Sequence, residues 1–306
     1  MFRTLIVQVG ERIRTENNWL CVESGEACSR IPLEDVYSVV IDNPRSSITI
    51  AALTALTDSG AHVLLCNEKH LPVTIVYPHN THYRPYNVLK KQFAMPQFEK
   101  DLCWQRVMQS KLLNQAKVLE LAGGANDVVR RLRSLALEVE PGDPGNREGI
   151  GAKMFFRGLY GSTFLRFSDD AVNAALNYGY AILRSAVTKT LYAYGFQTVL
   201  GIHHISETNP FNLAEDMIEP LRPLVDYWVV VNSDSLVETL TAQNRTGLVD
   251  IVNQPMLWEG KKMRVRTAID KYIGSFTSAV DKQDPLILKC PEVVAFPAYP
   301  VSYDDG

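Results

Sequence analysis

The chain has 306 residues, of which 46% are apolar and 21% are charged, as is usual for a globular protein. A disordered or fibrous chain is therefore excluded. The 31 lysines and arginines and the 34 acidic residues give a net charge of −3, which excludes a protein that coats nucleic acid or an anionic membrane through its overall charge. Binding to nucleic acid through a local basic patch remains open.

The five cysteines are scattered and form no CxxC pair, so neither a zinc site nor a disulfide framework is predicted. No segment reaches the roughly 18 uninterrupted apolar residues of a membrane-spanning helix, and the first residues resemble a strand rather than a signal peptide. We therefore expect a reduced, cytoplasmic environment and no association with a membrane.

Short apolar or alternating segments, separated by turn residues, predict a β-rich domain over residues 1–77. Its expected strands cover residues 4–9, 11–15, 19–22, 35–41, 62–66 and 73–76, with one short helix over 48–57. Residues 78–90 begin with a polar, turn-rich stretch and are interpreted as a linker.

After the linker the apolar spacing becomes helical, so residues 91–285 are predicted to form an all-α domain. The expected helices cover residues 98–121, 126–137, 147–167, 170–194, 212–221, 224–241 and 266–280. Residues 286–306 are interpreted as an ordered or frayed tail. The predicted fold class is α+β, with an N-terminal β-rich domain followed by an all-α C-terminal catalytic domain.

Glu148 lies at a predicted helix start, in the first turn after the capping residue Asn146. The helix dipole favours an ionised carboxylate there. Gly151 and Ala152 follow on the same face without bulk, so another element or a ligand can approach the carboxylate closely. Taken alone, an ordinary stabilising glutamate is the simpler interpretation of this pattern.

A second group of polar residues follows the apolar stretch that ends at residue 200. His203 and His204 point in different directions, so at most one of them reaches a given site. Asp216 and Glu219 share one helix face. Oxygen-rich sites with an imidazole suit manganese or magnesium better than structural zinc. The alternatives are a hydrogen-bonded structural histidine and a solvated acidic face in which Glu219 pairs with Arg222.

Four sequence blocks, in this order, carry a resemblance to a known family. They are Arg147-Glu148-Gly149-x-Gly151-Ala152, Val172-Asn173-x-x-Leu176-Asn177-Tyr178-Gly179-Tyr180, Leu200-Gly201-x-x-His204 and Asn212-Leu213-Ala214-x-Asp216-x-x-Glu219-Pro220-x-Arg222-Pro223. Together they resemble the CRISPR-associated spacer-acquisition integrases. The paired histidines and the run from Asn209 to Asn212 are similar to the type II branch of that family.

The resemblance implies a divalent cation, Mg²⁺ or Mn²⁺, that is bound by Glu148, His204 and Glu219. Asp216 matches an acidic position that supports the family's site, and His203 is interpreted as a neighbour rather than a ligand. Asn173 and Asn177 form an i, i+4 polar pair, which either hydrogen-bonds to the metal ligands or satisfies the end of a neighbouring helix.

The implied reaction is the insertion of captured DNA into a CRISPR array, by attack of a 3′ hydroxyl on a phosphodiester. The implied partners are double-stranded DNA (the captured fragment and the repeat target), a second copy of the chain bound through the β domain, and a small ferredoxin-like adaptation subunit. Other type II adaptation proteins and the RNA-guided effector are further expected partners. Two other interpretations stay open: a non-enzymatic DNA-binding scaffold, and a generic metal-dependent DNA nuclease without integration activity.

Three clusters of basic residues are candidates for contacts with DNA phosphates. They are Lys90 and Lys91; Arg130, Arg131 and Arg133; and Lys261, Lys262, Arg264 and Arg266. Each cluster is equally well interpreted as a solvated face. Tyr83, Tyr86 and Trp258 are candidates for stacking on splayed DNA ends.

Overall fold

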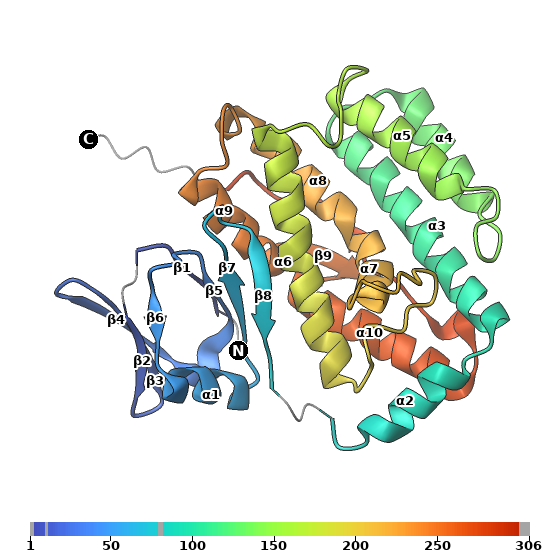
Figure 1. The fold of residues 1–306 in the computed structure, drawn as a ribbon. Helices are drawn as coiled ribbons and strands as arrows, with labels where there is room; N and C mark the ends of the chain where they lie inside the picture. Colours follow the sequence, from blue (N-terminus) through green and yellow to red (C-terminus); the bar gives the residue numbers. More distant parts are fainter. Residues whose placement is uncertain (1–2, 10–11, 79–81, 300–306) are drawn as a thin grey trace.

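The computed structural model describes residues 3–9, 12–78 and 82–299 of the chain. A strand-rich N-terminal part precedes a mostly helical C-terminal part (Figure 1), which confirms the predicted α+β class. The N-terminal part contains two four-stranded sheets. In sheet order, the first sheet consists of β1 (Arg3–Val7), β5 (Val36–Ile41), β7 (His62–Cys66) and β8 (Pro72–Val76). The second sheet consists of β4 (Ala27–Pro32), β3 (Trp19–Ser24), β2 (Arg12–Glu16) and β6 (Ser47–Ile48). The helix α1 (Ile50–Asp58) and the 3-10 turn η1 (Leu33–Asp35) also belong to this part.

Strand β5 lies inside the first sheet, between the parallel strands β1 and β7, and all six of its residues are buried. Its side chains are divided between two cores. Val36 and Val39 pack in the N-terminal core, whereas Tyr37 and Val40 pack in the core of the helical part. Because both faces of the strand are covered, its sequence is continuously apolar instead of alternating.

Helix α6 lies between the N-terminal sheet and the other helices (Figure 1). The helices of the C-terminal part are α2 (Pro85–Ala94), α3 (Gln97–Leu121), α4 (Asn126–Leu137), α5 (Arg147–Tyr160), α6 (Ala171–Ala193), α7 (Asn212–Ile218), α8 (Arg222–Val231), α9 (Ala242–Val249) and α10 (Val265–Lys282). The 3-10 turns are η2 (Glu219–Leu221), η3 (Ser233–Ser235), η4 (Asp250–Asn253) and η5 (Pro285–Ile287). Within the described ranges, no helix is long and apolar enough to span a membrane.

Several predicted boundaries are corrected by the structure; the helix expected over 224–241, for example, is α8 and ends at Val231. Residues 85–90, expected in the linker, form the start of α2. Pro85 occupies the first turn, which tolerates proline because an N–H there has no partner within the helix. The helix expected over 147–167 ends at Tyr160, and the loop after it is tied to α6 through Arg166.

The C-terminal part is not purely helical, contrary to the prediction. Strand β10 (Lys261–Arg264) forms a hairpin with β9 (Pro255–Trp258), and β11 (Glu292–Val293) pairs with the other edge of β9. The side chain of Asn114 on α3 accepts a hydrogen bond of 3.0 Å from the backbone N–H of Val293. The described residues of the expected tail are therefore an ordered part of the fold.

Buried polar contacts join the strand-rich and helical parts. Arg245 of α9 donates to Asp42, the residue after β5, at 2.8 Å. Lys189 of α6 donates to the backbone oxygen of Tyr37 at 3.1 Å, and its ammonium group lies 3.8 Å from the centre of the Tyr37 ring. His62 of β7 meets the same ring edge-on at 5.7 Å. These contacts hold α6 and α9 against the first sheet.

Candidate metal centre

Glu148 is the second residue of α5, and two side chains cap the start of this helix. Asn146 Oδ1 accepts from the backbone N–H of Gly149 at 3.1 Å, as predicted, and the Asp143 carboxylate accepts from that of Glu148 at 2.9 Å. The Glu148 side chain is 34% exposed, and its Oε1 lies 2.6 Å from the ammonium group of Lys111 on α3. The caps thus set the backbone position from which Glu148 reaches α3.

The missing side chain of Gly151 lets α5 lie close to α3. A Cβ atom at this position would lie 2.1 Å from Cδ2 of Leu112, a distance at which the Leu112 side chain or one of the helices has to move. Leu112 directly follows Lys111 in the sequence and is fully buried. The open face beside Glu148 therefore receives another helix, one of the two possibilities that the sequence allowed.

Glu219 follows α7 as the first residue of η2, and its side chain is only 5% exposed. Its Oε1 accepts from Nε of Arg222 at 2.8 Å, while Oε2 forms an ion pair with the Lys111 ammonium group. Burial by itself would raise the pKa of Glu219, but Arg222 and Lys111 outweigh it and lower this pKa to about 2. The carboxylate is therefore ionised at neutral pH.

His204 lies in the loop before α7, and Asp216 of α7 holds this loop. The buried Asp216 carboxylate accepts from the backbone N–H groups of Ile202 (2.7 Å), His203 (3.1 Å) and His204 (3.1 Å). It also lies 2.6 Å from Nδ1 of His204. Only glycine fits at Gly201, because a Cβ atom there would lie 2.3 Å from the backbone oxygen of His204.

The contact with Asp216 also decides which ring nitrogen of His204 is available to a ligand. A hydrogen bond from Nδ1 to the carboxylate raises the pKa of His204, against the effect of partial burial. The nearby carboxylates of Asp216, Glu219 and Glu148 raise it further. A carboxylate on one ring nitrogen orients the other toward a metal in many sites, so Nε2 of His204 is the nitrogen that suits a cation.

The two adjacent histidines do point in different directions. The ring of His203 stacks on Trp104 of α3, with centroids 4.0 Å apart and planes 1° from parallel. The ring of His204 meets the same indole edge-on, at 5.7 Å and 88°. His203 is thus occupied by an aromatic contact, in agreement with its interpretation as a neighbour.

Lys111 is the residue that the sequence analysis missed. Its side chain is 7% exposed and lies between the carboxylates of Glu148 and Glu219. A signal was present: the lysine follows the buried residues Trp104 and Val107 at helical spacing, on a stripe that is apolar up to that point. Lysine is almost never buried without a partner, so its position predicted an acidic partner.

A chain of ion pairs extends from this centre along α7. Arg222, which contacts Glu219, is also held by Glu215 at 2.7 Å. Glu215 in turn lies 2.7 Å from Arg184 of α6. The alternative pairing of Glu219 with Arg222 is therefore present, and it coexists with the contact to Lys111.

The residue types at and beside this centre fit a hard divalent cation. Two carboxylates and one imidazole are the oxygen-rich set that magnesium and manganese prefer, and Oε2 of the buried Glu219 carboxylate already binds one cation, the ammonium group of Lys111. Among the described residues, no three His, Cys, Asp or Glu side chains already stand in a metal-binding arrangement. The ammonium group of Lys111 lies between Glu148 and Glu219 instead.

A comparison with protein families matches residues 4–141 and 165–244, more than half of the chain, to the model of the CRISPR associated protein Cas1. The chain belongs to the Cas1 family. It is 38% identical over 301 residues to the CRISPR-associated endonuclease Cas1 of Neisseria meningitidis serogroup C (strain 8013), covering 97% of this chain and 98% of that protein. A Cas1 endonuclease of Pyrobaculum aerophilum is 26% identical over 253 residues, which are 78% of this chain and 84% of that protein.

Solved structures show the same fold. A casposase bound to integration product superposes with a TM-score of 0.76 at 15% identity, covering 92% of this chain and 91% of that one. A Cas1 protein from Thermotoga maritima has a TM-score of 0.74 at 15% identity, with coverage of 91% and 97%. At these identities the likeness concerns the fold alone.

The asparagine pair of α6 binds a loop, and its hydrogen bonds among the described residues do not involve Glu148, His204 or Glu219. Arg166 donates to Oδ1 of Asn173 (3.0 Å) and to Oδ1 of Asn177 (2.8 Å). Asn173 also donates to the backbone oxygen of Leu165 at 2.9 Å. In the described part of the chain, the hydrogen bonds of both amides therefore hold the loop between α5 and α6.

The basic residues proposed for DNA contacts differ in their exposure to solvent and in their contacts within the protein. Lys90, Arg130, Lys261, Lys262 and Arg264 are exposed. The other four make contacts within the protein: Lys91 with Asp281, Arg131 with Glu138, Arg133 with Glu120 and the half-buried Arg266 with Asn253.

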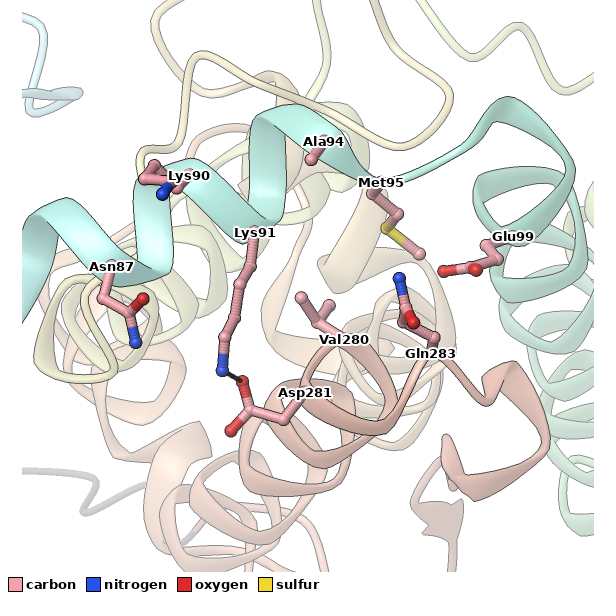
Figure 2. Close-up of a pocket in the computed structure, with 9 residues that line it drawn as sticks. All are labelled: Asn87, Lys90, Lys91, Ala94, Met95, Glu99, Val280, Asp281 and Gln283. Carbon is pink, nitrogen blue, oxygen red and sulfur yellow. Dashed lines mark hydrogen bonds and ion pairs between the residues drawn. The ribbon is translucent and has the colours of Figure 1, made fainter.

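Figure 2 shows the first of these contacts, in which Lys91 of α2 reaches Asp281 of α10 at 2.8 Å. The two residues border a cavity of about 300 Å³ between α2, α10 and the start of α3.

The aromatic residues proposed for stacking on DNA differ in exposure. Tyr83 and Tyr86, near the start of α2, are 82% and 73% exposed. Trp258 is buried in the hydrophobic core, so its expected stacking on DNA is wrong.

Proposed function

We propose that this Cas1-family chain is a metal-dependent DNA integrase and endonuclease, which inserts captured DNA fragments into a CRISPR array. The observation that carries the proposal is the meeting of Glu148 and Glu219, from distant segments of the chain, at one cationic centre beside His204. Family membership and the 38% identity to a Cas1 endonuclease support the same reaction class.

In the proposed reaction, the 3′ oxygen of the captured fragment forms a bond to a phosphorus atom of the array. The bond from that phosphorus to the 3′ oxygen of the array strand breaks, and the departing strand takes up a proton. A bound Mg²⁺ or Mn²⁺ would neutralise the charge of the pentacovalent transition state and favour ionisation of the attacking hydroxyl.

The residues that would hold the cation are the carboxylates of Glu148 and Glu219 and Nε2 of His204. Asp216 orients the imidazole through Nδ1, and Arg222 holds one oxygen of Glu219. The other oxygen, Oε2 of Glu219, pairs with the Lys111 ammonium group. The supporting residues thus set the direction of each donor before a substrate arrives.

The DNA and protein partners belong to the same proposal. We assign phosphate contacts to the exposed lysines and arginines of α2, α4 and β10, and base stacking to Tyr83 and Tyr86. Residues 1–77 are proposed to form a homodimer, which a small ferredoxin-like subunit bridges. A chain of a solved Cas6-RT-Cas1–Cas2 complex superposes with a TM-score of 0.72 at 18% identity, covering 96% of this chain and 36% of that one. Type II adaptation proteins and the RNA-guided effector are proposed as further partners.

One assay separates the proposal from its alternatives. The protein is incubated with Mn²⁺, a short duplex with free 3′ hydroxyls and a supercoiled plasmid that carries the repeat, with and without the small subunit. Joined product supports integration, cutting without joining supports a generic nuclease, and DNA binding without either supports a scaffold.

Variants of the centre test the assignment of residues in the same assay. Glu148→Ala, His204→Ala and Glu219→Ala are each expected to abolish joining, and Glu207→Gln, an exposed carboxylate in the loop after His204, is the control. Joining at the wild-type rate by any of the three alanine variants would contradict the site. Binding to forked DNA is expected to fall steeply as salt rises, because phosphate contacts release counterions.

A further inference from the structure

Lys111 lies where two proposed metal ligands meet. Its Nζ is 2.6 Å from Oε1 of Glu148 and also contacts Oε2 of Glu219. The lysine and Glu219 are both nearly inaccessible to solvent. One ammonium group thus bridges carboxylates that come from α5 and from the end of α7.

The charges of this cluster balance as the structure stands. Along the connected ion pairs, Glu148, Glu219 and Glu215 contribute three negative charges, and three positive charges come from Lys111, Arg222 and Arg184. A divalent cation added beside the ammonium group would place like charges a few ångströms apart, where their repulsion is large in a buried site. The ammonium group and the cation therefore compete for the same oxygens.

A second observation concerns where the lysine can go. Gln115 lies one helical turn further along α3, is 2% exposed, and has a buried side-chain oxygen without a hydrogen-bond partner. Residues four apart on a helix are neighbours on its surface, so this oxygen is an acceptor for a displaced ammonium group. Such an unpaired buried acceptor is costly unless another state satisfies it.

We propose that Lys111 takes the place of the divalent cation in the metal-free protein, and that metal binding displaces its ammonium group from between Glu148 and Glu219. The inference rests on the metal centre assigned under the proposed function. Lys111 is thus a positioning residue, which keeps the two carboxylates together in the absence of metal and weakens the apparent affinity for metal.

The test measures binding of Mn²⁺ by calorimetry and the melting temperature with and without Mn²⁺, in the full-length protein. Without metal, Lys111→Met is expected to melt at a lower temperature than wild type. Mn²⁺ is expected to raise the melting temperature of the variant more than that of wild type. The variant is also expected to bind Mn²⁺ at least about tenfold more tightly than wild type does. Lys117→Met is the matched control, because Lys117 is on the same helix but pairs with Glu120 at the surface. This control is expected to behave like wild type in both measurements.

Affinity in Lys111→Met equal to or weaker than that of wild type overturns the inference but leaves the metal centre intact. Absence of a one-to-one Mn²⁺ site in both proteins removes the metal centre and the inference together. If Lys111→Met does not fold, Lys111→Gln replaces it, because an amide can still donate to Glu219 without carrying charge. The same expected gain in affinity, and the same overturning result, apply to that variant.

Discussion

One oxygen of Asp216 contacts two atoms of His204: Oδ1 lies 2.6 Å from the ring Nδ1 and accepts a hydrogen bond of 3.1 Å from the backbone N–H. Its other oxygen accepts from two further N–H groups of the same loop, those of Ile202 and His203. One buried carboxylate therefore shapes the loop and turns the imidazole at the same time. In metal sites generally, loss of a carboxylate that supports a ligating histidine lowers the affinity for metal by about 10- to 100-fold.

We expect Asp216→Asn to lower the affinity for Mn²⁺ by about 10- to 100-fold. The amide nitrogen of asparagine cannot accept the N–H groups that one carboxylate oxygen now accepts, so the loop and the ring lose their orientation. Calorimetry with Mn²⁺ measures the effect, and the strand-joining rate should fall with the affinity. Glu207→Gln is the control, and wild-type affinity in Asp216→Asn would contradict the positioning role.

The two glutamates of the centre should differ in their effect on stability. Glu219→Gln leaves Lys111 and Arg222 beside a neutral side chain in a buried site, which typically costs about 3–5 kcal/mol of unfolding free energy. Glu148 is 34% exposed, so Glu148→Gln should cost about 1 kcal/mol or less. Urea unfolding without metal compares the two variants. Equal losses would mean that the Glu219 pairs are not buried in solution.

Gly151→Ala tests the close approach of α5 to α3. Alanine favours a helix over glycine by about 1 kcal/mol, yet here its Cβ would lie 2.1 Å from Leu112. Overpacking of this kind costs about 1–3 kcal/mol, so we expect a net loss of stability together with slower strand joining. Lys153→Ala, an exposed site on the same helix, is the control. A variant more stable than wild type would contradict the contact.

His62 should make the protein sensitive to acid. Burial, and then Lys189, lower the pKa of His62 from 6.5 to about 3. Between about pH 3 and pH 6.5 the unfolded chain binds a proton at His62 that the folded protein does not bind. The free energy of unfolding therefore falls as pH decreases through 6.5. From about pH 7.5 to pH 5 the loss from this group is about 2 kcal/mol.

Replacement of the histidine isolates this contribution. His62→Gln should flatten the pH dependence of the unfolding free energy, measured by urea denaturation at both pH values. Ser185→Ala is the control, because the hydroxyl lies 3.4 Å from Nε2 of His62 but does not titrate in this range. The control should retain the wild-type slope. An unchanged slope in His62→Gln would mean that His62 is accessible to protons in the folded state.

Local sequence predicted the long helices well. The predicted helix over residues 126–137 has the boundaries of α4, and the helix predicted over 98–121 differs from α3 by one residue. These segments carry a helical apolar stripe, which is a local property. The hairpin β9–β10 was missed because its strands have only four residues each, and β9 also pairs with β11 some 35 residues further along the chain.

The proposed ligands came from short motifs, and the structure explains part of their spacing. Leu200-Gly201-x-x-His204 requires glycine because the loop turns back on itself around Asp216. The role of Asn173 and Asn177 did not follow from their spacing. Which group an amide meets depends on the loop that carries Arg166, and the path of that loop is not encoded in the i, i+4 pattern.

The sequence by itself determined the α+β class, most helix positions, the absence of an overall positive charge and the motifs that carry the family resemblance. These are local or additive properties: periodicity, capping, charge sums and spacing. Only the tertiary structure decided that Lys111, Glu148 and Glu219 meet, because they lie on three segments separated by at least 37 residues. Charges that meet in a buried site change one another's ionisation and affinity for metal, and no local pattern contains that information.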